Sequence, residues 1–167
     1  MIAGGLTAGL AAGVVGGLAS FVPRPMAAIL VLACAALACV VDAAGSASRL
    51  PQNGRQVPKE IDRRGPVVAA LQFGFELGTG ARTYVTSAAP YAALAAVVFL
   101  GDVPAAMSAG FGFGMGRAAM TTLRFVSRDV DAWDRLLARR IRAIALASTV
   151  CAALAVSGLV VLETRSF

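Results

Sequence analysis

The sequence contains no histidine and few charged residues. Of its 167 residues only 14% are charged, whereas 58% are apolar, and the mean hydropathy is +0.77. A soluble domain of this length carries far more charge, so the composition predicts a polytopic membrane protein. Without histidine there is no haem with a histidine ligand, and the scattered carboxylates and thiols do not suggest a transition-metal site. We therefore expect no cofactor.

Cysteine is also scarce. Cys34, Cys39 and Cys151 form no C-x-x-C pair. Cys34 and Cys39 are five positions apart, which on a helix turns their side chains roughly 140° from one another, so they cannot form a disulfide without unwinding the helix. We expect all three to pack as small hydrophobic residues.

The net charge of +6 comes from arginine. Fourteen of the fifteen basic residues are Arg, against nine acidic residues, and most lie in two hydrophilic connections, 46–65 and 124–142. This pattern is typical of cytoplasmic loops rather than of a nucleic-acid-binding face, so we expect the lipid bilayer as a partner and no nucleic acid. The N-terminal MIAGGLTAGL has no basic residue before its apolar stretch, and we expect it to remain in the mature protein.

Five apolar segments are expected to cross the membrane, at about 2–21, 26–44, 66–101, 104–122 and 143–162, each but the third near the ~20 residues that span the hydrocarbon. Both arginine-rich connections should be cytoplasmic, which requires an even number of spans between them. One long, interrupted span at 66–101 satisfies this requirement. We therefore predict an all-α bundle of five spans in a bacterial-type cytoplasmic membrane, as a single domain with the N-terminus inside. A re-entrant hairpin within 66–101, giving six membrane segments, also keeps the parity.

A cytoplasmic amphipathic helix is expected at 127–142, before the last span. Ser127 is a candidate N-cap, and Val130, Trp133, Leu137 and Ile141 form one stripe opposite the arginines. We predict that this helix lies on the membrane surface. Trp133 would anchor it, with Arg139, Arg140 and Arg142 near lipid phosphates.

Two segments carry glycine at every fourth position or close to it. In the first segment the row is Gly5, Gly9, Gly13 and Gly17, and in the fourth segment Gly112 and Gly116 share one face while Gly110 and Gly114 share another. Such rows let two helix backbones approach closely, where dispersion replaces the hydrophobic drive that lipid does not supply. They predict close packing, within this chain in the first place or else between copies.

Two charges interrupt the apolar third segment, in the stretch QFGFELGTGARTY. Glu76 lies 11 residues from Gly65, or roughly 16 Å into the membrane, near its midplane. A carboxyl at that depth must be protonated, face water or pair with a cation. The candidate cations are Arg82, which Gly78-Thr79-Gly80 would bring closer by unwinding, and Arg117 of the fourth segment.

Hydroxyl groups follow Glu76 and can satisfy the backbone of a broken helix. They belong to Thr79, Thr83, Tyr84, Thr86 and Ser87. Broken membrane helices form the binding sites of many transporters, so these groups, with Glu76, Arg82 and Arg117, are the predicted binding site. The alternative is that Glu76 and an arginine form a buried pair that only fixes packing.

The stretch GFELGTGARTYVTSAAPY, followed by a span that ends in GFGFGMGRA, resembles the membrane domain of the cytochrome c biogenesis and DsbD family of thiol-redox transporters. The resemblance covers residues 66–120 and implies a glycine-rich span broken in its middle. That family works through a Cys-Pro pair in each of two broken helices. Residues 66–120 contain no cysteine, so the resemblance implies the scaffold and not the electron relay.

Two functions remain open at this point. The first is a small carrier or relay that uses the interrupted third span, and the second is a non-catalytic subunit or assembly factor of a larger membrane complex. Both favour a homo-oligomer or other membrane subunits as partners, because one copy of 167 residues has little room for a pathway. An enzyme is the weakest reading, since no nucleophile with a base, metal set or phosphate loop is visible.

Overall fold

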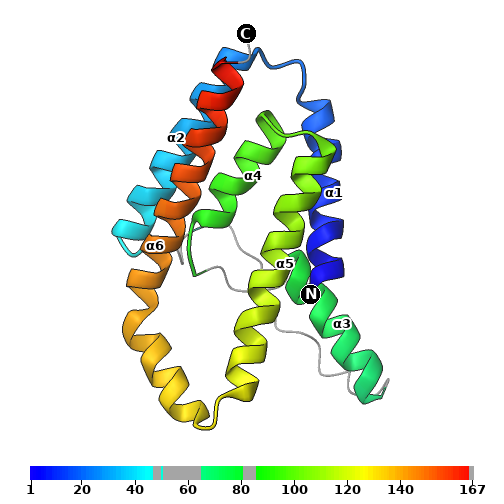
Figure 1. Cartoon of the computed structure of the whole chain (residues 1–167), viewed down its shortest axis with the longest axis vertical. Coiled ribbons are helices and arrows are strands. Elements are labelled where there is room, and N and C mark those ends of the chain that lie inside the picture. Colours follow the sequence, from blue (N-terminus) through cyan, green and yellow to red (C-terminus); the bar gives the residue numbers. More distant parts are fainter. Residues whose placement is uncertain (47–49, 51–64, 81–85, 166–167) are drawn as a thin grey trace.

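The structure is a computed structural model that describes residues 1–46, 50, 65–80 and 86–165, all in helices and the turns between them. The described residues form six helices, whose arrangement Figure 1 shows. Their bounds are α1 (Ile2–Leu18), α2 (Arg24–Ala43), α3 (Pro66–Thr79), α4 (Ala89–Phe99), α5 (Val103–Val126) and α6 (Val130–Arg165). The predicted all-helical fold is confirmed for these residues.

Four of the helices contain a proline in their first turn. Pro25, Pro66, Pro90 and Pro104 open α2, α3, α4 and α5. Proline has no N–H group, and in the first turn that group would have no partner inside the helix anyway. These prolines therefore mark where each helix begins without weakening it.

The helices form two groups that share α4. In the first group α2, α4 and α6 enclose a core of small side chains, among them Val31, Ala35, Ala92 and Val156. In the second group α1 packs along α5 and also contacts α3. Helix α4 touches α1 and α5 as well, so it joins the two groups.

Glycine allows the close contact of α1 with α5. A Cβ added at Gly5 would overlap the carbonyl oxygen of Gly110, and one at Gly9 would overlap the carbonyl oxygen of Ala106. A Cβ built at Gly13 would lie 3.1 Å from the Cβ of Ala106. The predicted close packing of these three glycines is therefore found, and its partner is a helix of the same chain.

Other members of the predicted glycine rows make no such contact. A Cβ on Gly17, Gly112 or Gly116 would meet nothing within 4 Å. On α5 it is the opposite pair, Gly110 and Gly114, that faces α1. Packing of Gly17, Gly112 and Gly116 is therefore not found among the described residues of this chain, and their packing against another copy stays a prediction.

The predicted third span is divided into two helices. Helix α3 ends at Thr79 and α4 begins at Ala89, so the interruption falls within 66–101. The division into five spans is not shown. Two helices, α2 and α6, are long and apolar enough to cross a membrane, and α1, α3 and α4 are shorter apolar helices.

The amphipathic helix predicted at 127–142 forms the first part of α6. Helix α6 runs without a break from Val130 to Arg165, so the arginine-rich segment and the apolar segment after it are one helix of 36 residues. Figure 1 shows the first part of α6 and the end of α5 extending together below the end of α2. The helical part of this prediction is therefore found, as a helix that runs into the last apolar segment, and its position on the membrane surface stays a prediction.

Candidate functional site

The interruption between α3 and α4 begins at a glycine. Gly80 adopts a left-handed conformation with φ of 72°, which favours glycine, and its N–H donates to the carbonyl of Leu77 at 3.3 Å. The sequence Leu77-Gly78-Thr79-Gly80 thus ends α3 through local backbone geometry.

Two carbonyl groups near the C-terminal end of α3 accept hydrogen bonds from side chains of the same chain. The Thr79 hydroxyl donates to the Glu76 carbonyl at 2.8 Å, and Arg117 Nη1 of α5 donates to the Leu77 carbonyl at 3.3 Å. The Arg117 guanidinium also lies 5.3 Å from the ring centroid of Phe113. A cation at this position complements the negative end of the helix dipole.

The amide end of α4 is bonded to a carboxylate from α2. Asp42 accepts from the Ala88 N–H, which is 2.9 Å from each of its two oxygens. The Ser87 hydroxyl donates to Asp42 Oδ2 at 2.9 Å, and the Thr149 hydroxyl of α6 donates to the same oxygen. Asp42 is 5% exposed and Thr149 is fully buried. This cluster of Asp42, Ser87 and Thr149, hereafter the Asp42 cluster, joins α2, α4 and α6.

At the interruption, each helix end therefore lies beside a side chain whose charge is opposite to that end of the helix dipole. Asp42 places an anion at the positive end of α4, and Arg117 places a cation at the negative end of α3. The Leu77 carbonyl of α3 and the Ala88 N–H of α4 thus have partners within the described chain.

A pocket lies where α4 faces α1 and α5. Its volume is about 290 Å³. Side chains and backbone from α1, α4, α5 and the end of α3 line it, chiefly Gly9, Tyr91, Leu94, Ala109 and Phe113. Thr79 and Gly80 also line it, so it adjoins the point where α3 ends.

The structure brings only part of the predicted binding site together. Thr79 lines the pocket, whereas Arg117 turns to the Leu77 carbonyl, and Glu76 Oε1 accepts from Gln72 Nε2 at 3.1 Å. The other predicted site residues, Arg82, Thr83 and Tyr84, lie outside the described residues. The convergence of Glu76 with an arginine stays a prediction.

Asp42 and Thr149 were not among the predicted site residues. Asp42 is the only charged residue in the apolar part of α2, which was a visible signal, but it lies near the end of the predicted span. Ser87 was included among the hydroxyls after Glu76. Its partners are separated from it by 45 and 62 positions, a distance at which sequence patterns do not show pairing.

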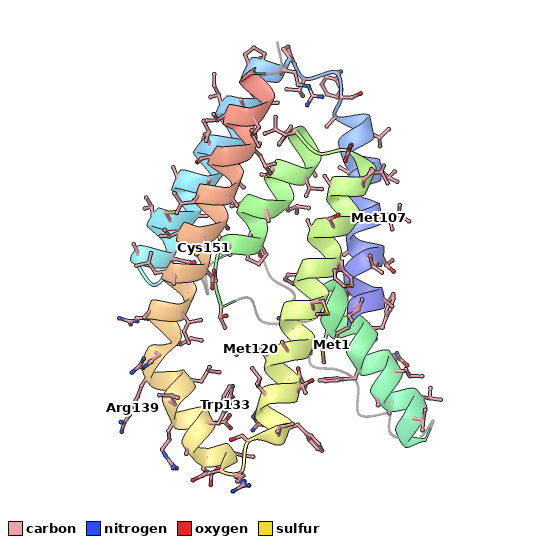
Figure 2. The ribbon with its side chains drawn as sticks, in the orientation of Figure 1. Met1, Met107, Met120, Trp133, Arg139 and Cys151 are labelled. Atoms are coloured by element: carbon pink, nitrogen blue, oxygen red, sulfur yellow. The ribbon has the colours of Figure 1, made fainter. Side chains whose placement is uncertain are left out.

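The predicted surface residues lie on the first part of α6. In Figure 2 Trp133 lies on the side of α6 toward α5, whereas Arg139 points to the opposite side. Near the turn, Arg124 of α5 forms an ion pair with Asp134 of α6 through two hydrogen bonds of 2.9 and 2.7 Å. That pair lowers the pKa of Asp134 and raises that of Arg124. It fixes the ends of α5 and α6 to each other.

Comparison with known proteins finds no match among protein-family models, curated proteins or solved structures. The resemblance of residues 66–120 to the cytochrome c biogenesis and DsbD family therefore stays a prediction.

Proposed function

We propose that the protein is an integral membrane protein of the cytoplasmic membrane. Two helices have the length and apolarity for a membrane span, and large apolar side chains are exposed along the bundle. Phe21, Leu18, Ile29 and Leu154 are each more than 60% exposed. Side chains of this kind are stable in contact with lipid, whereas a monomer in water rarely exposes so many.

The proposed membrane boundaries follow from α2 and α6. These helices lie side by side in opposite directions, with Thr149 beside Asp42 and Arg142 near Gly45. The cytoplasmic boundary is placed at Arg142, where the apolar part of α6 begins and the arginine-rich part ends. In this placement the start of α1 lies at the cytoplasmic boundary. Gly78 packs on Met1 there, so Glu76 would lie at that boundary and not at the predicted midplane.

The first prediction concerns this orientation. Helices α2 and α5 run in the same direction in Figure 1, so the helix ends that lead into the two arginine-rich connections point the same way. In a variant without native cysteines, Ser46→Cys and Ser127→Cys should both react with an impermeant thiol reagent from the cytoplasmic side only. Reaction from opposite sides of the membrane would contradict the proposed topology.

Within this placement we propose a small carrier. The observation that carries the proposal is the pocket, which lies between α4 and the pair of α1 and α5, reaches the end of α3 at Thr79 and Gly80, and lies against Gly9 and Ala12 in the middle of α1. Carriers of many folds place their substrate near the midplane, between two groups of helices and next to broken helices. The pocket resembles such sites in its depth along α1 and in adjoining a helix break, and the break itself lies at the cytoplasmic boundary of the proposed placement.

A second candidate is a non-catalytic membrane subunit, and one observation favours it. The face of α5 that contains Gly112 and Gly116 has no neighbour within 4 Å of a built Cβ, and Met115 beside it is 44% exposed. A helix of another copy or another protein can approach this face closely. This candidate requires an assembly and does not require an accessible pocket.

Access to the pocket separates the two candidates. In a variant without native cysteines, Ala93→Cys and Ala109→Cys place a thiol on the pocket wall, and Ala119→Cys provides an exposed control on α5 outside it. A carrier must expose its pocket to each side in turn, so the pocket thiols should react with an impermeant reagent added from either side. Reaction from one side only, or none, would favour the subunit.

A further inference from the structure

We infer that the pocket between α1, α4 and α5 takes an uncharged, apolar molecule. This inference rests on the proposed carrier function and names the substrate class of the same site. Three observations support it: the pocket walls, the two bonded helix ends at the interruption, and the pocket volume.

The pocket walls consist mostly of small apolar side chains. They come from Ala8, Gly9 and Ala12 of α1, from Pro90, Ala93, Leu94 and Val97 of α4, and from Ala106, Ala109, Gly110 and Phe113 of α5. Among the described lining residues none is charged, and the hydroxyl-bearing side chains are Thr79 and Tyr91. The Thr79 hydroxyl already donates to the Glu76 carbonyl.

Groups at the helix ends that could bind an ion are engaged within the chain. In many carriers the exposed amides of a broken helix bind an anionic substrate and its exposed carbonyls bind a cation. Here the Ala88 amide is bonded to Asp42, and the Leu77 carbonyl is bonded to Arg117. A charged solute in the pocket would lose its hydration and gain no counter-charge from the described residues, which is strongly unfavourable in an apolar site.

The pocket volume limits the size of the occupant. At about 290 Å³ it lies at the lower end of the range for ligand pockets, roughly 300–1,000 Å³. It fits a small ring system or a short part of an alkyl chain. The rings of Tyr91 and Phe113 provide flat apolar surface for such a group.

Equilibrium binding in mild detergent tests the substrate class with a matched pair of fluorescent probes. 1-Aminoanthracene, uncharged at neutral pH, should bind saturably with one site per chain, whereas anthracene-1-sulfonate, with the same rings and a negative charge, should show no saturable site. Ala109→Phe, which fills the pocket, should weaken aminoanthracene binding at least tenfold. Ala119→Phe, on the exposed face of the same helix, should bind as the wild type does. Ala93→Leu is the second filling variant, used if Ala109→Phe does not fold.

Each other outcome has a definite meaning. Equal aminoanthracene binding by wild type and both filling variants would show that the probe does not enter the pocket, and would overturn the inference. Saturable sulfonate binding that the filling variants abolish would also overturn it, because the pocket would then accept a charge. Aminoanthracene binding without reaction of the pocket thiols from both sides would refute the carrier function and leave the ligand class in place.

Discussion

Gly5→Leu is expected to prevent stable folding of the protein. The first atom added at Gly5 would overlap the Gly110 carbonyl oxygen and would come within 3.0 Å of the backbone of Gly114. Overpacking by a methylene group in a soluble core typically destabilises by about 1–3 kcal/mol, and here the obstacle is backbone, which cannot change rotamer. Helices α1 and α5 would have to separate along their whole contact. Thermal melting and gel filtration in mild detergent measure the effect.

Gly17→Leu and Gly112→Leu are the matched controls. Both glycines are on the same two helices, and a Cβ at either position meets nothing within 4 Å. We expect the free energy of unfolding to change by about 0.5 kcal/mol or less. A Gly5→Leu protein that melts like the wild type would refute the observed packing of α1 on α5. Loss of an oligomer in Gly112→Leu alone would support the subunit candidate.

The glycine spacing predicted that α1 packs closely on another helix, but not where the contact ends. The row continues to Gly17, whereas α5 begins at Val103, which lies opposite Gly13. No backbone of α5 extends as far as Gly17. The spacing of small residues is local information, and the longitudinal offset of two helices depends on the turns that connect them.

The break in the third segment could be predicted because its signal is local. Gly78-Thr79-Gly80 is a local signal, and Gly80 does take the left-handed conformation that ends α3. The position of Glu76 relative to α1 could not be predicted, because counting residues from Gly65 assumes a helix that enters the membrane there. The packing of Gly78 on Met1 instead places Glu76 near the start of α1.

The Asp42 cluster shows the limit of reading the sequence most clearly. Asp42 and Thr149 are 107 positions apart, and each by itself has an ordinary explanation, Asp42 at a helix end and Thr149 as a small residue within an apolar helix. Their pairing follows only from the antiparallel contact of α2 with α6. Once the helices are placed, the carboxylate has donors from two other parts of the chain.

Asp42→Ala is expected to destabilise the protein by roughly 2–4 kcal/mol, because a buried donor left without its acceptor costs about 1–3 kcal/mol and the loss of an anion at a helix start about 1 kcal/mol more. The change would leave the Ala88 N–H and the Ser87 and Thr149 hydroxyls without their common acceptor in an apolar surrounding. It would also remove the anion at the start of α4. Because these bonds join three helices, α4 should lose its fixed position against α2 and α6. Thermal melting in detergent measures the loss.

Asp102→Ala is the matched control for this prediction. Asp102 also accepts from the N–H of a helix start, that of Ala105 at 2.7 Å, but it is exposed. Its removal should destabilise by only about 1 kcal/mol, as for an ordinary helix cap. Thr149→Val should fall between the two variants, because it removes one donor to the carboxylate and leaves Ser87 and Ala88 in place. Equal melting of Asp42→Ala and Asp102→Ala would show that Asp42 is solvated rather than buried, and that α4 is held by its apolar contacts alone.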